Sequence, residues 1–359
     1  MMKKVLVCAL DWGLGHATRC VPIVRELQKR GADVWISSSG NALHFLRQEF
    51  PSLTSFELPA YDPQYSATAS MPLKIMSQLP KFIRVVKKEH EQVEKIARDC
   101  KIDIIISDNR YGCWSSNVKS IFITHQANLL MPPGFGWLAP PINLIGYQFI
   151  KKFLEVWIPD NPGSGLTTPF VSNGKLNQKY IGWLSRFQMR KGIGQRYKII
   201  ALVSGPEPQR TIFENLMAKE LKASGLKSLL IEGKPRERLH KQEGSLEIVN
   251  HLATHELEEA ILASELVISR SGYSSVMDLI ALGKRAFFVP TPGQTEQGYL
   301  ARVLKEMKIA GSSSQDKFDL SDALHQSSNF KGFSEWVSTP DLLMDTIDEL
   351  LAPNRSSFH

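Results

Sequence analysis

The first candidate site is a stretch of two glycines and a histidine, DWGLGHATR, which spans residues 11–19 and follows an apolar run. Glycine has no Cβ, so a backbone that contains it can turn sharply or approach a ligand closely. Gly15 precedes His16, whose ordinary pKa near neutrality suits a general base. The histidine could instead cap the helix that follows. Its place after two glycines at the end of an apolar run favours a site.

A second candidate site, SRSGYSSVMD at residues 269–278, combines residue types that bind anions. Gly272 permits a tight turn, and the hydroxyls and free backbone N–H groups at the start of the next predicted helix suit a phosphate. These groups belong to Ser271, Tyr273 and Ser274. Plain N-capping by serine is the alternative. It does not explain Asp278, an acidic residue one turn into the same helix.

Three further loops carry polar side chains that could act with these two sites. The stretch VPTPGQTEQGYLA contains Glu296 and Gln297, an acid and an amide that suit sugar hydroxyls, although such a pair is often only a solvated first turn. Asp108 ends the run IDIIISD and could orient His16, as an acid does in a catalytic triad. The stretch SGPEPQRT supplies candidate anion contacts, namely Ser204, Gly205 and Arg210.

The glycine loop does not match a dinucleotide-binding fingerprint. Thr18 stands where the third glycine of G-x-G-x-x-G would be. The next apolar run, ADVWISSS, ends in serines, where such proteins have an acidic residue for the ribose. A nicotinamide cofactor is therefore not expected, and no other cofactor is predicted.

Short β-branched runs that alternate with helical periodicity must position these loops. KKVLVCAL, ADVWISSS, IDIIISD and SIFITHQ are predicted strands, with a helix predicted over VPIVRELQKRG. The same alternation begins again with KIIALVSG. It predicts parallel sheets wrapped by helices, in which ligands bind at the carboxyl ends of the strands. All of the candidate loops follow predicted strands.

The length of the chain and the restart of the pattern predict two domains. The chain has 359 residues, which is long for a single core. We predict an N-terminal domain over residues 1–185, a basic linker over 186–194, and a second domain over 195–335. The remaining segment, 336–359, is predicted to hold an amphipathic helix, PDLLMDTIDELLA.

The composition is that of an ordinary globular protein, with 43% hydrophobic and 22% charged residues. The net charge of +7 favours anionic partners without choosing among them. The four cysteines form no C-x-x-C pair, and no apolar run approaches the ~20 residues of a membrane span. We expect no signal peptide, no nucleic-acid partner and a cytoplasmic location.

Taken together, these motifs resemble those of the GT-B glycosyltransferases. The chain is most similar to the bacterial N-acetylglucosaminyltransferases that make the peptidoglycan lipid precursor, and to related UDP-sugar enzymes. The resemblance covers both halves and is most specific from Ser269 to Ala301, with a Ser-Arg-x-Gly turn, an acid one turn into the helix, a strand ending in Val-Pro and a glutamine before the next helix. It implies an α/β fold of two Rossmann-like domains that face each other across a cleft.

The resemblance also implies roles for individual residues. Ser271 and Gly272 match the pyrophosphate turn, and Asp278 matches the acid that binds the ribose, where the most similar enzymes have glutamate. Glu296 and Gln297 match contacts to the donor sugar. Asn250 and His251 fall where the family holds the nucleobase. His16 matches a histidine implicated in activating the acceptor.

The implied reaction moves a hexose or N-acetylhexosamine from a nucleotide sugar, with UDP as the expected nucleotide, to an unknown acceptor hydroxyl. The sequence contains no Asp-x-Asp motif, so we expect an inverting mechanism that needs no metal. Two other classes stay open at this point. One is a UDP-sugar hydrolase or 2-epimerase on the same fold, and the other is a nucleotide-sugar binding module without catalysis.

The segment 71–92 mixes apolar and basic residues as a helix on an acidic membrane would. A core-facing apolar stripe with a solvated basic edge explains the pattern equally well. The membrane interpretation predicts a peripheral location at the inner membrane surface and a lipid-linked acceptor. Its apolar members are Met71, Leu73, Ile75, Met76, Leu79, Phe82 and Ile83, and its basic members are Lys74, Lys81, Arg84, Lys87 and Lys88.

Overall fold

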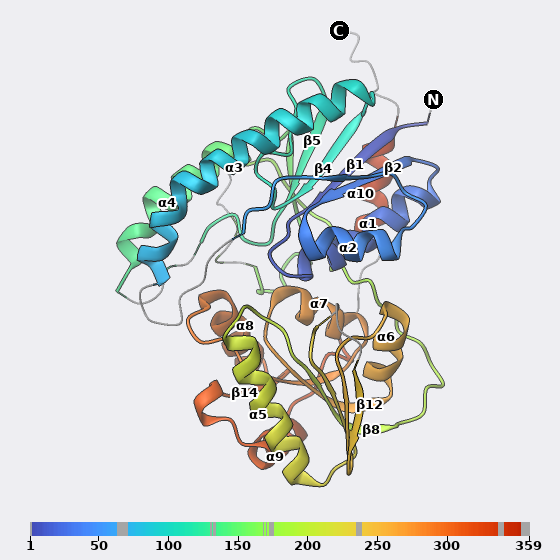
Figure 1. Cartoon of the computed structure of the whole chain (residues 1–359), viewed down its shortest axis with the longest axis vertical. Helices are drawn as coiled ribbons and strands as arrows, with labels where there is room; N and C mark the ends of the chain where they lie inside the picture. The colour runs from blue at the N-terminus through green and yellow to red at the C-terminus, as the bar shows by residue number, and fades with distance from the viewer. Residues whose placement is uncertain are drawn as a thin grey trace.

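The computed structural model folds into two α/β halves, one above the other in Figure 1. It describes residues 2–62, 71–129, 131, 134–167, 169, 171, 176–234, 239–336 and 341–352. Within these residues, each half contains one seven-stranded sheet. The predicted α/β architecture of two Rossmann-like halves is confirmed.

The sheet of the first half is parallel and has the strand order β3-β2-β1-β4-β5-β6-β7. Its strands are β1 (Lys4–Ala9), β2 (Asp33–Ser38), β3 (Ser55–Glu57), β4 (Ile104–Asp108), β5 (Lys119–Ile123), β6 (Glu155–Ile158) and β7 (Gln178–Tyr180). The helices of this half are α1 (Gly15–Lys29), α2 (Gly40–Glu49), α3 (Met71–Asp99) and α4 (Ala139–Ile150).

The sheet of the second half has the order β10-β11-β9-β8-β12-β13-β14, and only its edge strand β10 pairs in the antiparallel sense among the described strands. Its strands are β8 (Tyr197–Leu202), β9 (Ser228–Ile231), β10 (His240–Glu243), β11 (Leu246–Val249), β12 (Ser264–Ser269), β13 (Arg285–Phe288) and β14 (Gly311–Ser312). The later helices are α5 (Gln209–Ser224), α6 (Thr254–Leu262), α7 (Tyr273–Ala281), α8 (Thr295–Glu306), α9 (Leu320–Ser328) and α10 (Asp341–Leu351).

Helix α1 begins earlier than the sequence predicts. It starts at Gly15, so His16 lies in its first turn, whereas the prediction began the helix at Val21. Proline is favoured in the first turn of a helix and is uncommon further inside one. Here Pro22 lies inside the helix instead. The glycine loop and the helix are therefore one continuous element that presents His16.

The last helix, α10, packs on the first half although it follows the second half in sequence (Figure 1). Arg30 of α1 pairs with Asp348 through Nε and Oδ1 at 2.5 Å. Ile347 of α10 is fully buried in the same apolar cluster as the core of α1. The chain therefore crosses between the halves twice, and Trp183 of the first crossing stacks on Trp336 of the second, with ring centroids 5.4 Å apart.

The predicted linker is packed rather than loose at its start. Phe187 is buried, and Leu184 just before it donates its backbone N–H to the sulfur of Met277 on α7 at 3.4 Å. The predicted boundaries at residues 185, 195 and 335 stay predictions, although the strands of the two sheets lie on either side of the linker. Residues 337–340 and 353–359 of the last segment lie outside the described residues.

Candidate functional site

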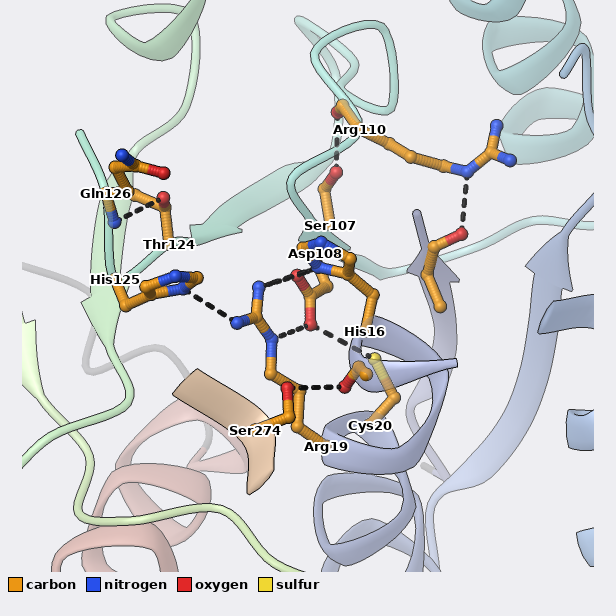
Figure 2. A network of polar contacts seen from close by, with 12 residues as sticks. His16, Arg19, Cys20, Ser107, Asp108, Arg110, Thr124, His125, Gln126 and Ser274 are labelled. Atoms are coloured by element: carbon orange, nitrogen blue, oxygen red, sulfur yellow. Dashed lines mark hydrogen bonds and ion pairs between the residues drawn. The ribbon is translucent and has the colours of Figure 1, made fainter. Parts of the chain in front are cut away.

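His16, Asp108 and Arg19 form a buried cluster where β1 and β4 end (Figure 2). Asp108 Oδ1 lies 2.9 Å from His16 Nδ1, as the sequence predicts for an orienting acid. Both carboxylate oxygens of Asp108 also accept from Arg19, which the sequence analysis missed. Arg19 lies one helical turn after His16, so its spacing was available as a signal.

The surroundings set the charge of these groups. Burial and then the charge of Arg19 lower the pKa of His16, more than Asp108 raises it. Burial opposes ionisation of Asp108, but Arg19 and His16 outweigh it and hold the pKa of that carboxyl well below its usual range. His16 is therefore neutral and Asp108 ionised at neutral pH. A neutral imidazole is the form that can accept a proton.

His125 connects this cluster to the second half. It follows β5, the strand next to β4, and its Nδ1 lies 2.8 Å from Nη1 of Arg19. A guanidinium only donates hydrogen bonds, so Nδ1 accepts and Nε2 carries the proton. Nε2 donates to Glu296 Oε1 at 3.1 Å, across the two halves. The same rule that selected Asp108, a polar residue at the carboxyl end of a strand, could have found His125.

The start of α7 touches the start of α1. Ser274 Oγ donates to the carbonyl oxygen of Gly15 at 3.1 Å, as the dashed line in Figure 2 marks. A Cβ on Gly15 would lie 2.7 Å from Ser274 Oγ, so only glycine fits at this position without a shift. The carboxyl edges of the two sheets therefore face each other, and the predicted base and the predicted phosphate turn lie at one place.

The backbone of α7, more than its hydroxyls, is available for an anion. The N-cap is Gly272, and no side chain caps the helix, so serine N-capping is not what these residues do. The hydroxyls of Ser271 and Tyr273 are used inside the protein, because they donate to the carbonyl oxygens of Gln297 at 2.8 Å and Pro159 at 3.1 Å. The predicted hydroxyl contacts of these two residues need correction. The backbone N–H groups in the first turn of α7 remain the candidate contacts for an anion.

Asp278 lies beside Ser185, the last residue of the predicted first domain, and Arg186, the first residue of the predicted linker. Ser185 Oγ donates to Asp278 Oδ1 at 2.6 Å, and burial raises the pKa of Asp278 to about 6. The Arg186 side chain packs over the rings of Phe45 and Phe187, and its Nε has no partner among the described residues. Burial and the charge of Arg186 lower the pKa of His251, which places this predicted nucleobase residue in the same region.

Two other predicted contacts are engaged elsewhere. Asn250 is buried and donates to Glu232 Oε2 at 2.7 Å, away from its neighbour His251. Gln297 accepts from the backbone N–H of Thr291 at 2.8 Å and donates to Gln294, so its side chain holds its own loop.

Arg210 faces two carboxylates instead of an open anion site. Its Nε donates to Glu207 at 2.7 Å and its Nη1 to Glu214 at 2.6 Å. Glu207 lies three residues earlier, just before α5, and Glu214 lies four residues later on α5. Its charge is therefore already balanced, which corrects the prediction that it neutralises a leaving group. Gly205, at a φ of 112°, and the exposed Ser204 lie in the loop before this helix and stay predicted contacts.

Comparison with known proteins identifies relatives of this chain. Residues 213–328 match the model of the glycosyltransferase family 28 C-terminal domain. The chain is 23% identical over 334 residues to an uncharacterized glycosyltransferase of Methanosarcina mazei, which covers 84% of this chain and 83% of that protein. It is 20% identical over 283 residues to the UDP-N-acetylglucosamine–N-acetylmuramyl-(pentapeptide) pyrophosphoryl-undecaprenol N-acetylglucosamine transferase of Halalkalibacterium halodurans, covering 76% and 70% of the two chains.

Among solved structures, the spinosyn rhamnosyltransferase SpnG complexed with thymidine diphosphate matches with a TM-score of 0.62 at 12% identity, over 97% of this chain and 96% of that one. The chain is a GT-B glycosyltransferase. The expected enzyme class is thus confirmed, and the non-catalytic binding module is set aside. In the enzyme, the first half carries the His16 cluster and the matched family domain carries the start of α7.

Proposed function

We propose that this glycosyltransferase moves a hexosyl or N-acetylhexosaminyl group from a UDP-sugar to an acceptor hydroxyl, with inversion and without a metal. One observation carries the proposal: a neutral His16, paired with an ionised Asp108, lies against the uncapped start of α7 through the contact between Ser274 and Gly15. A proton acceptor and an anion site thus meet where the two halves touch.

In the proposed reaction, His16 acts as the general base. His16 Nδ1 lies within hydrogen-bond distance of both Asp108 Oδ1, at 2.9 Å, and Arg19 Nη2, at 2.8 Å. The proposed tautomer is the one that donates Nδ1–H to Asp108, which leaves Nε2 free to take the acceptor proton. The acceptor oxygen attacks the anomeric carbon of the donor as the bond from that carbon to the diphosphate oxygen breaks. Asp108 stabilises the imidazolium that forms, while Arg19 keeps Asp108 ionised.

The start of α7 is proposed to hold the diphosphate. The positive end of the helix dipole and its free N–H groups favour an anion at this point. Thymidine diphosphate, bound by a protein of the same fold, has the same diphosphate chemistry. Asp278, half-buried near Arg186, is proposed to accept from the ribose hydroxyls.

A donor panel tests the proposal. The purified enzyme is incubated with UDP-, GDP- and dTDP-sugars, with and without lipid extract and with and without EDTA, and the products are identified. We expect transfer from UDP-sugars that survives EDTA. Free sugar released at the full rate without any acceptor would show a hydrolase instead, and activity restored only by Mg²⁺ or Mn²⁺ would contradict the metal-free mechanism.

We further propose that the acceptor is lipid-linked and that the enzyme binds the inner membrane surface peripherally, with α3 and α4 in contact. These helices run side by side (Figure 1), and Phe82 of α3 contacts Phe149 of α4 with ring centroids 6.2 Å apart. Trp137 and Leu144 near or on α4 are 69% and 59% exposed. Exposed basic residues follow on α3, namely Lys81, Arg84, Lys87 and Lys88.

The helix predicted over 71–92 is present within α3, but the side chains of residues 71–76, including Met71, Leu73, Lys74, Ile75 and Met76, lie outside the described residues. None of the helices that the structure describes is long and apolar enough to span a bilayer. Sedimentation with anionic and neutral liposomes tests the proposal. We expect salt-sensitive binding to anionic vesicles that Trp137→Ser with Leu144→Ser weakens, and no binding at low salt would remove the idea.

A further inference from the structure

Arg270 differs from the other fully buried arginines of the described chain. Arg19 pairs with Asp108, and Arg110 pairs with Glu89 at 2.5 Å. Arg270 is only 1% exposed, yet no carboxylate of the described residues lies within ion-pair distance of it. A buried charge is costly unless an opposite charge or several hydrogen bonds compensate it.

The hydrogen bonds of Arg270 all reach neutral oxygens in loops around the carboxyl edge of the second sheet. Nη1 donates to the carbonyl oxygens of Val289 at 3.0 Å and Pro290 at 3.2 Å. Nη2 donates to the carbonyl oxygen of Gln209 at 3.0 Å and to Oε1 of Gln315 at 2.5 Å. The guanidinium thus joins the loops that follow β13 and β14 to the start of α5.

The remaining surroundings of Arg270 are apolar or unpaired. Its guanidinium carbon lies 4.1 Å from the ring centroid of Phe213, and its Nε has no partner in the part of the chain that the structure describes. Burial lowers the pKa of Arg270 to about 10, so it stays charged at neutral pH. Its positive charge therefore remains without a counter-ion in the described protein.

Arg270 stands next to the candidate anion site in the chain. It directly precedes Ser271 and Gly272, and Gly272 is the N-cap of α7. The uncapped N–H groups of that helix and the unbalanced guanidinium come from the same short stretch. Two features that favour negative charge thus meet at one loop, whereas Arg210, the cation that the sequence favoured, is already balanced by Glu207 and Glu214.

We propose that Arg270 is a positioning residue for the donor: it fixes the loops around the start of α7 and supplies a permanent positive charge that the diphosphate of the nucleotide sugar balances. This inference rests on the proposed function. In the reaction, negative charge grows on the diphosphate as its bond to the sugar breaks, and a fixed nearby cation favours that change without moving.

Calorimetry with UDP and uridine tests the role, since only UDP carries the diphosphate. If the donor panel selects another base, its diphosphate and nucleoside replace this pair. We expect Arg270→Met to weaken UDP by about tenfold or more, as loss of a poorly screened charge should, and to change uridine affinity by less than about threefold. Arg270→Lys keeps the charge and should keep the ratio of the two affinities within about threefold of wild type.

Phe213→Leu is the matched structural control, because it loosens the packing under the guanidinium and leaves the charge in place. It should lower the melting temperature without changing the UDP-to-uridine ratio. Arg270→Gln carries the same prediction as Arg270→Met should the latter fail to fold. An unchanged ratio of UDP to uridine affinity in the folded Arg270→Met or Arg270→Gln variant overturns the inference. Arg270 would then only hold the surrounding loops together. Wild-type enzyme that binds no nucleoside diphosphate overturns the proposed function itself.

Discussion

The two halves of the enzyme use similar loops after parallel strands but treat charge in opposite ways. In the first half, Arg19 is balanced by Asp108, and His16 beside them is neutral. In the second half, α7 begins without a side-chain cap and Arg270 has no carboxylate partner among the described residues. The first half is suited to move a proton, and the second is suited to receive an anion.

This comparison predicts that damage to each half changes a different quantity, the rate constant kcat for the first half and the dissociation constant Kd of the donor for the second. A base acts in the chemical step, so its loss lowers kcat. An anion site acts when the donor binds, so its loss raises Kd. Substitutions at His16, Asp278 and Gly15 probe the separation.

Loss of the base should have the largest effect. His16→Ala is expected to lower kcat by about 10²–10⁴-fold, the usual contribution of a positioned acid–base group, and to leave UDP affinity nearly unchanged. Steady-state kinetics and calorimetry measure the two quantities. His44→Ala, at an exposed position on α2, is the matched control and should behave as wild type. A folded His16→Ala enzyme with near wild-type kcat and a lower melting temperature would return the histidine to a structural role.

Loss of the ribose acid should affect binding alone. Asp278→Ala is expected to weaken UDP by about 1–3 kcal/mol, the value of charge-assisted hydrogen bonds. Because burial raises the pKa of Asp278 to about 6, the carboxylate is ionised above that pH and protonated below it. Uridine affinity should therefore fall by up to roughly fourfold from pH 7.5 to 5.5, as the ionised fraction falls.

Uridine is the probe for this pH dependence because it has the ribose but no phosphate that titrates in the same range. Asp278→Asn should remove the pH dependence in calorimetry. Equal UDP affinity in wild type and Asp278→Ala would show that the ribose is bound elsewhere.

The smallest expected effect tests whether the halves must touch. A Cβ on Gly15 would approach Ser274 Oγ to 2.7 Å, so Gly15→Ala should push the two loops apart and lower kcat/KM by about fivefold, the equivalent of about 1 kcal/mol. Adding Ser274→Ala removes the obstructing oxygen and should restore much of the loss. If the second change restores nothing, the closed contact is not part of the active arrangement.

The sequence predicted the elements better than their partners. Apolar periodicity located the core strands of both halves, and the rule that ligands bind at the carboxyl ends of strands brought His16 and Asp108 together at 2.9 Å. The start of α1 was predicted too late, at Val21 instead of Gly15. Strand periodicity is local, so it is visible in a single sequence.

The sequence did not show which polar side chains are already bound by neighbouring residues and so are not available to a ligand. Arg210 and Gln297 have the right residue types for donor contacts, but near neighbours in their own segments already engage them. Arg19 and His125 carried local signals, namely the helical spacing from His16 and the end of a strand, but the pairing of Arg19 with residues 89 and 106 positions away is visible only in the folded chain. Which side chain stays available for a ligand depends on the folded geometry.

Because α10 returns to the first half, two segments connect the halves, one that contains Trp183 and one that contains Trp336. We call these two segments struts. Trp183 and Trp336 stack on each other, so the two struts are joined where they run together. Cutting the chain in one strut would leave the other intact, whereas a fragment that ends at residue 185 would lose α10 and uncover the face of α1 against which Ile347 is buried. The enzyme therefore suits circular permutation within a strut better than division into two separately expressed halves.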